Sequence, residues 1–215
     1  MIITKQKPFE EILGFLKDKQ KVFITGCSLC ATSCMTGGQQ QIDEMKRKLE
    51  EWGKEVTGSV VLDPSCHKLQ ARATLKKHKE ELAQADAILC MACGDGAQTV
   101  AGIATTPVYP ANDTLFIGEI ERVGQFHEAC KACGQCELGW TAGVCPITKC
   151  AKSLLNGPCG GAKSGKCEVN PENDCAWVLI YNRLKAQDML DTLLEMKPPK
   201  DYSKAAHPRK LVAGR

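Results

Sequence analysis

The chain has 215 residues, 14 of them cysteine, and a formal net charge of +3 at pH 7. Basic and acidic residues are interleaved over most of the chain and only 5 % of the residues are aromatic, which argues against a nucleic-acid-binding surface. The cysteine content is well above ordinary usage, which leaves two classes: a disulfide-rich secreted protein or a metalloprotein.

Three features of the sequence favour the metalloprotein. Charged residues interrupt every apolar stretch in the first 20 residues, so we expect no signal peptide. No run of about 18 apolar residues exists, so we expect no membrane span. The repeated C-x2-C spacing suits a metal better than a cross-link, since cysteines that close rarely make a structural bridge. We therefore expect a protein of the reducing cytoplasm.

Residues 1–118 alternate between predicted strands and helices. Apolar residues at helical spacing predict helices over residues 9–16, 39–52, 69–82 and 97–103. Short apolar runs predict strands over residues 21–25, 56–62 and 87–91, and a fourth strand that begins at residue 107. This alternation implies right-handed crossovers, and hence an α/β fold in which a small parallel sheet is flanked by helices.

The second part of the chain has a different character. Residues 119–172, here called the Cys-rich segment, are rich in Cys and Gly and lack apolar periodicity. Because no run in it is long enough to bury a core, we expect its irregular fold to depend on bound metal. A C-terminal helix is predicted from about Asp174 to about Glu195, and residues 201–215 resemble a basic extended tail. We divide the chain into an α/β domain, residues 1–118, and a Cys-rich metal-binding domain, residues 119–215.

Five cysteines follow the predicted strands of the α/β domain. Cys27, Cys30 and Cys34 come after the first strand, Cys66 after the second and Cys93 after the third. Carboxyl ends of parallel strands meet at one edge of a sheet, which is where ligands bind. Five thiols then compete for four positions at one metal, and one or two of them would be small buried side chains. Cys90 lies inside the third strand and is assigned to the core.

The other eight cysteines form two sets of four. The first set is Cys130, Cys133, Cys136 and Cys145, and the second is Cys150, Cys159, Cys167 and Cys175. The first set begins C-x2-C-x2-C and ends in Cys-Pro, like a bacterial ferredoxin loop, although its longer final gap means that the ferredoxin fold is not implied. Three thiolates on one loop and a fourth from elsewhere can hold an iron–sulfur cluster or zinc.

The choice between iron–sulfur and zinc stays open, and we favour iron–sulfur. The short spacing alone favours zinc, whereas an almost pure cysteine inventory, the Cys-Pro element and thirteen candidate ligands favour iron–sulfur. We expect two or three [4Fe-4S] clusters, with zinc as the alternative at one site. His67 and His127 lie close in sequence to candidate cysteines, which leaves a mixed Cys/His zinc site open.

Longer motifs carry a family resemblance. They are KCAKSLLNGPCGG at residues 149–161, GKCEVN at 165–170 and DCAW at 174–177, with GCxxC at 26–30, Cys34, GG at 37–38, ACG at 92–94 and ACGxC at 132–136. With these motifs the chain resembles the small iron–sulfur subunit of two-subunit methylenetetrahydrofolate reductases of acetogenic and related anaerobic bacteria. The resemblance covers essentially the whole chain except the basic tail. The second half is also similar to the methylenetetrahydrofolate reductase C-terminal domain found beside such enzymes.

The resemblance implies a partner and a role. The partner is a flavin-containing catalytic subunit, a (β/α)8 barrel with FMN that reduces methylene- to methyl-tetrahydrofolate, and further electron-transfer proteins are a second class of partner. The chain itself has no G-x-G-x-x-G after its first strand, no P-loop and no catalytic motif. The expected function is therefore that of a non-catalytic electron-transfer subunit, relaying electrons through its clusters to the flavin of the partner. Two alternatives stay open: a structural docking module held by zinc or clusters, and a self-sufficient metalloenzyme.

Overall fold

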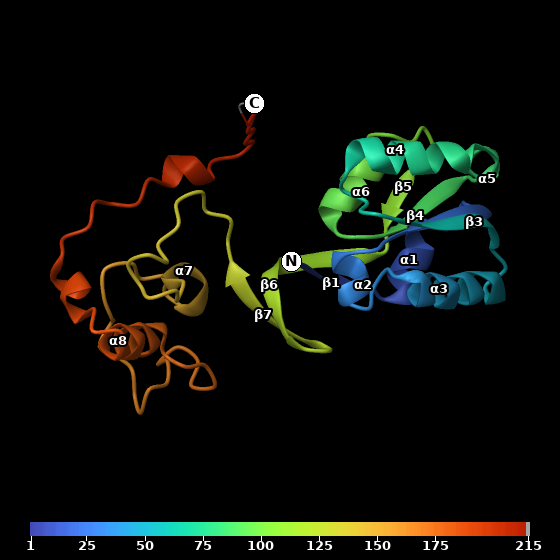
Figure 1. The fold of residues 1–215 in the computed structure, drawn as a ribbon. Helices are drawn as coiled ribbons and strands as arrows, with labels where there is room; N and C mark the ends of the chain where they lie inside the picture. Colours follow the sequence, from blue (N-terminus) through green and yellow to red (C-terminus); the bar gives the residue numbers. More distant parts are fainter. Residues whose placement is uncertain (214–215) are drawn as a thin grey trace. The chain divides into compact units, whose positions relative to one another are not determined.

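A computed structural model describes residues 1–213 and divides into two compact units (Figure 1). The first unit comprises residues 1–116 and 120–126, and the second comprises residues 117–119 and those from 127 onward. The domain boundary predicted after residue 118 falls inside strand β6 (Asn112–Arg122). No helix among residues 1–213 combines the length and the apolar character needed to cross a membrane.

The first unit is built on a four-stranded sheet with the order β3-β2-β4-β5. Its strands are β2 (Lys21–Cys27), β3 (Glu55–Leu62), β4 (Ala87–Met91) and β5 (Val108–Pro110). Every neighbouring pair is parallel. This confirms the predicted fold class, a small parallel sheet flanked by helices.

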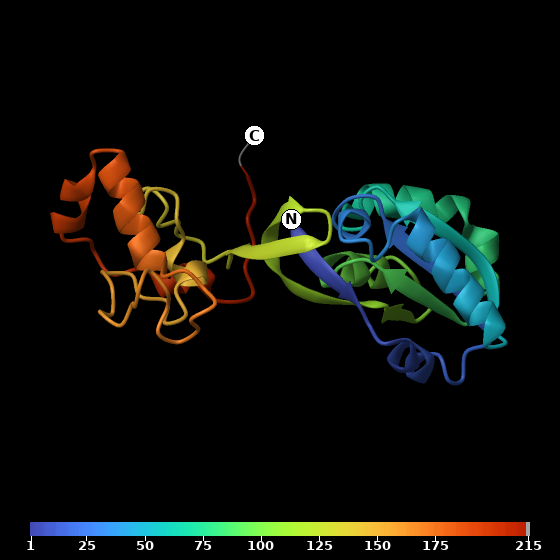
Figure 2. The same ribbon diagram turned by 90° about the horizontal axis from the view of Figure 1, so that it is seen from below.

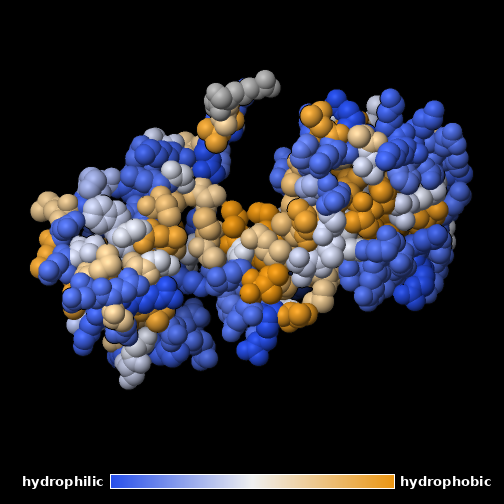
Figure 3. Space-filling model, viewed as in Figure 1, coloured by the Kyte–Doolittle hydropathy of each residue, from blue (hydrophilic) through white to orange (hydrophobic). Residues whose placement is uncertain are grey.

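Helices cover both faces of this sheet (Figures 1 and 2). They are α1 (Phe9–Phe15), α2 (Cys30–Ser33), α3 (Gln39–Glu51), α4 (Lys68–Lys77), α5 (Lys79–Gln84) and α6 (Gly94–Ala101). Strand β4 shows how the two faces are filled, because side chains alternate along a strand. Leu89 packs in one apolar cluster with α1 and α3, whereas Ile88 packs in a second cluster with α4 and α6. The outer surfaces of these helices are hydrophilic (Figure 3).

The helix predicted over residues 69–82 is two helices, so its continuity was wrong. Helix α4 ends at Lys77 and α5 begins at Lys79. The backbone of His78, between them, leaves the helical conformation. The His78 ring packs against Phe23 with a centroid distance of 5.8 Å, and its Nδ1 lies 3.3 Å from Glu81 Oε1. These contacts with the sheet and with α5 accompany the break.

A second sheet, with the order β1-β6-β7, was not predicted. It contains β1 (Ile2–Gln6), β6 and β7 (Gln125–Cys130), of which β6 and β7 form a hairpin across Val123 and Gly124. Gly124 has a φ of +77°, the left-handed conformation that favours glycine in a tight turn. The Cys-rich segment is therefore regular in its first residues and irregular after Cys130.

The second unit contains little regular structure. It has α7 (Pro146–Lys149), α8 (Ala176–Ala186) and the 3-10 turns η1 (Leu190–Leu194) and η2 (Tyr202–Ala205). Its buried core is the small cluster of Val144, Trp177, Ile180 and Leu184. The predicted C-terminal helix is present as α8, but its predicted end at Glu195 was wrong. Asp188 adopts a φ of +55°, which stops the helix.

Candidate metal centres

The carboxyl edge of the parallel sheet carries the five cysteines predicted to share a site. Cys27 is the last residue of β2, Cys66 lies beyond the end of β3, and Cys93 lies beyond the end of β4 as the N-cap of α6. Cys30 begins α2 and Cys34 follows it. The parallel topology thus brings chain segments far apart in sequence to one edge, as expected from the strand order.

Four of these thiols are linked by electrostatic interactions. Burial raises the pKa of the Cys66 thiol, and Asp95, Cys27 and Cys93 raise it further. Burial also raises the pKa of Cys93, with a further contribution from Cys30. Neighbouring thiolates repel one another, and a bound cation reverses that repulsion. Burial and neighbouring charges therefore favour the neutral thiols of Cys66 and Cys93, and a bound cation would oppose this effect.

Two glycines let the loop of residues 27–38 fold back over the sheet edge. A Cβ on Gly37 would lie 1.7 Å from Met91 O, and one on Gly26 would lie 2.3 Å from Gly37 O. The backbone N–H of Cys27 donates to Gly37 O at 2.9 Å, which closes the loop. No side chain fits at either glycine, so the position of Cys30 and Cys34 depends on both.

Two buried polar side chains, which the sequence did not single out, tie the cysteine-bearing segments together. Ser65 Oγ donates to Gly26 O at 2.9 Å, joining the Cys66 turn to β2. Asn112 Nδ2 donates to Thr36 O at 3.2 Å and to Ala92 O at 3.3 Å, joining the Cys34 loop to the segment that leads to Cys93. Ser65 is adjacent to Cys66 in sequence, whereas no local signal marks Asn112.

Strand β1 lies against the sulfurs of α2. The backbone N–H of Ile2 donates to Cys30 Sγ at 3.5 Å, and Cys34 Sγ donates to Ile2 O at 3.7 Å. Cys90 is the most deeply buried cysteine of the first unit, although Cys27, Cys34 and Cys93 are buried as well. It lies in the second apolar cluster, which also contains Cys27, and burial raises the pKa of Cys90 to about 11. The prediction that Cys90 belongs to the core is confirmed.

Backbone amides point at sulfur atoms in both units. The N–H of Ala132 donates to Cys130 Sγ at 3.3 Å. The amides of Asn170 and Val169 lower the pKa of Cys167. At Cys93 the amides of Gly96 and Asp95 oppose the effect of burial on the pKa. In each case the donor lies two or three residues after the cysteine.

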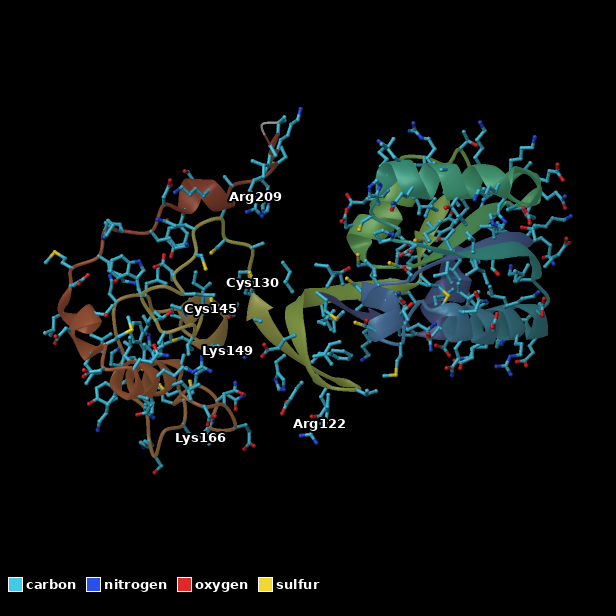
Figure 4. The ribbon with its side chains drawn as sticks, in the orientation of Figure 1. Arg122, Cys130, Cys145, Lys149, Lys166 and Arg209 are labelled. Atoms are coloured by element: carbon cyan, nitrogen blue, oxygen red, sulfur yellow. The ribbon has the colours of Figure 1, made fainter. Side chains whose placement is uncertain are left out.

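A hydrogen bond joins the segment that carries Cys145 to the segment that carries Cys130. Cys130 ends β7 and Cys145 is the N-cap of α7 (Figure 4). Thr148 Oγ1, within α7, donates to Ala129 O at 3.3 Å and so attaches the short helix to the end of β7. This contact supports the assignment of Cys145 to the same set as Cys130.

The second set is spread around the small core. Cys150 and Cys175 pack against it, and Cys159 Sγ donates to Glu168 Oε1 at 3.2 Å. All fourteen cysteines lie within the described residues and are free thiols. Among residues 1–213 no three Cys, His, Asp or Glu side chains form a ready-made ligand sphere. His67 Nδ1 accepts the Gln70 N–H at 3.4 Å as a cap of α4. Metal ligation by the thirteen candidate thiols stays a prediction, and the soft donor set fits iron–sulfur or zinc.

These observations define a cysteine-rich α/β protein with backbone amides directed at cysteine sulfurs in both units. A comparison with protein families gives a match for the second part of the chain. Residues 109–203 match the family described as methylene-tetrahydrofolate reductase C terminal, and the matched range includes both sets of four cysteines. This match confirms the resemblance of the second half of the chain to the methylenetetrahydrofolate reductase C-terminal domain. No curated protein and no solved structure gave a match.

Proposed function

We propose that the chain is an accessory electron-transfer subunit of a methylenetetrahydrofolate reductase complex and that it binds iron–sulfur clusters through its cysteines in a reducing cytoplasm. The family match of residues 109–203 supports the association with this enzyme. The observation that carries the metal-binding part is the set of amides directed at Cys93, Cys130 and Cys167, one cysteine in each predicted group. A backbone that stabilises thiolates suits soft-metal ligation.

The residues of the chain have distinct roles in this proposal. The thirteen thiols other than Cys90 are the candidate ligands, and Gly26, Gly37, Ser65 and Asn112 position the cysteine segments at the sheet edge. When bound, iron–sulfur clusters supply one-electron carriers, and a flavin on the partner can combine single electrons into the two-electron reduction of the folate.

Metal analysis of the anaerobically purified chain tests the ligand assignment. We expect iron and acid-labile sulfide together with a broad visible absorption that bleaches on reduction. Cys93→Ser, Cys130→Ser and Cys167→Ser should each lower the iron content. Cys90→Ala is the matched control, since this buried thiol of the same sheet should leave the iron content unchanged. Zinc without a visible absorption band would contradict the iron–sulfur assignment.

Co-expression with a flavin-containing reductase tests the role. We expect the two chains to purify together, and reductase turnover with reduced methyl viologen to fall when the clusters are lost. Failure to form a complex would contradict the subunit assignment. A complex whose turnover does not depend on the clusters would favour the structural docking module. The small apolar core of the second unit is the observation that supports this alternative. Turnover by the purified chain alone would favour the self-sufficient enzyme.

A further inference from the structure

The segment of residues 197–209, here called the strap, runs along the loop of residues 130–136, here called the three-cysteine loop. Lys200 Nζ donates to Gln135 O, and the N–H of Asp201 donates to Gln135 Oε1 at 2.8 Å. Arg209 Nη1 donates to Ala132 O at 2.6 Å, at the other end of the contact (Figure 4). The strap therefore binds backbone and side-chain groups between the cysteines of the loop.

The approach of the two segments is close enough to require a glycine. Gly134, between Cys133 and Cys136, has a φ of +78°, and a Cβ there would lie 2.6 Å from Lys204 O. Its conformation and its contact thus both exclude a side chain. The three-cysteine loop and the strap are matched in shape as well as in hydrogen bonding.

Lys200 carries a buried charge. Its side chain is 1 % exposed, and it is the one charged residue in the buried set of residues 1–213. Glu137 Oε1 lies 3.5 Å from Lys200 Nζ, but Glu137 Oε2 also pairs with Lys197 Nζ at 3.3 Å. Two ammonium groups therefore share one carboxylate, and Lys200 Nζ has Gln135 O as a further acceptor, as a buried charge requires.

The Cys133 sulfur lies beside the Lys200 ammonium group. Cys133 Sγ donates to Gln135 O at 3.3 Å, and Lys200 Nζ donates to the same oxygen. The two groups therefore share one acceptor. The ammonium group of Lys200 occupies a fixed place next to one candidate ligand.

We propose that the strap holds the three-cysteine loop in its ligating conformation and that Lys200 is a positioning residue, which places a permanent positive charge beside the Cys133 sulfur. The inference rests on the proposed metal binding by this loop. Four thiolates around a divalent metal make a site of net negative charge, and a fixed cation beside one of them stabilises that site. Residues that contact metal ligands in this way typically change metal affinity by about 10- to 100-fold.

Protection of Cys133 from alkylation by Co²⁺ measures this effect in the full-length chain. Metal-free protein is titrated with Co²⁺ under anaerobic conditions, treated with iodoacetamide and analysed by peptide mass spectrometry. Lys200→Met removes the charge at similar length and should raise the half-protecting Co²⁺ concentration about 10- to 100-fold. Lys200→Arg keeps a charge and should stay within a few-fold of the wild type. Protection of Cys167 in the same samples should not change.

Lys204→Met is the matched control, because it removes an exposed positive charge from the same strap. It should leave the half-protecting concentration at Cys133 unchanged. Equal values for Lys200→Met and the wild type would overturn the role of Lys200. An equal loss in Lys204→Met would show that overall charge, rather than the position of Lys200, is responsible, and would overturn it as well.

Amide hydrogen exchange of the metal-free protein tests the strap without any metal. Arg209→Gln keeps Lys200 in place and removes the hydrogen bond to Ala132 O. We expect faster exchange in residues 131–136 with unchanged exchange in α8, and unchanged exchange in both regions for Lys204→Met. Wild-type exchange rates in both Arg209→Gln and Lys200→Met would overturn the proposal that the strap holds the three-cysteine loop. If Co²⁺ does not protect Cys133 in the wild type, metal binding by the loop fails, and the exchange comparison alone decides whether the strap holds the loop.

Discussion

Gly37→Ala should destabilise the first unit and displace the loop that carries Cys30 and Cys34. The added Cβ would lie 1.7 Å from Met91 O and 2.9 Å from Ala31 Cβ, so the loop has to move away from the end of β4. Overpacking of a tight site costs about 1–3 kcal/mol. The movement also weakens the 2.9 Å hydrogen bond from Cys27 N–H to Gly37 O, which is worth about 0.5–1.5 kcal/mol.

Together these effects predict a loss of roughly 3 kcal/mol in the free energy of unfolding. For a chain of this length that corresponds to a fall in Tm of about 6–12 °C. Gly14→Ala is the matched control, because it adds the same methyl group within helix α1, where nothing lies within 4 Å of the new Cβ. Alanine there should raise stability by about 0.5–1 kcal/mol. Calorimetry of both variants tests this prediction. A Gly37→Ala protein with the Tm of the wild type would refute the close approach of Gly37 to Met91 O.

Three further predictions follow from single contacts. Asn112→Ala should lower the urea midpoint by an amount equivalent to about 2 kcal/mol, because two buried carbonyl groups lose their donor; an unchanged midpoint would contradict this. The backbone amides of Lys21 and Gln20 lower the pKa of Asp86 below 3.8, so its contribution is present at neutral pH and lost as the pH falls through that range. Stability of the wild type should therefore fall more steeply below about pH 4 than that of Asp86→Asn, whereas parallel curves would refute it. Cys133→Ser should make the Cys-rich segment sensitive to protease, and resistance equal to that of the metal-loaded wild type would show that its fold does not need this ligand.

The parallel sheet was predictable because its two central strands, β2 and β4, are nearly continuous apolar runs. Strand β4 is buried at all five positions, and its sequence allows no other element of that length. Strand β1 and the β6–β7 hairpin were missed because their residues are mostly half-buried or exposed, so apolar periodicity is weak. The usable signals were the β-branched run from Ile2 to Thr4 and the Val123-Gly124 turn.

The candidate site, too, was predictable only in part. Strand order alone placed Cys27, Cys66 and Cys93 at one edge, since the topology of a parallel sheet fixes where its strands end. Asn112 and Lys200 were beyond reach of the sequence. Asn112 bonds groups 76 and 20 residues away, and Lys200 bonds a carbonyl 65 residues away. A single polar residue has no periodicity that reveals such a distant partner.

Different interactions stabilise the fold of each unit, and this difference bears on the choice between an electron carrier and a docking module. The first unit buries an apolar cluster on each face of its sheet, so its fold does not depend on the cysteine edge. The second unit has one small apolar cluster and otherwise relies on polar contacts around its cysteines, such as those of the strap with Gln135. Loss of metal should therefore cost the first unit its site but not its fold, whereas the second unit should lose both. A variant confined to the sheet edge, such as Cys93→Ser, is consequently the better probe of electron transfer, because a docking surface in the second unit would survive it.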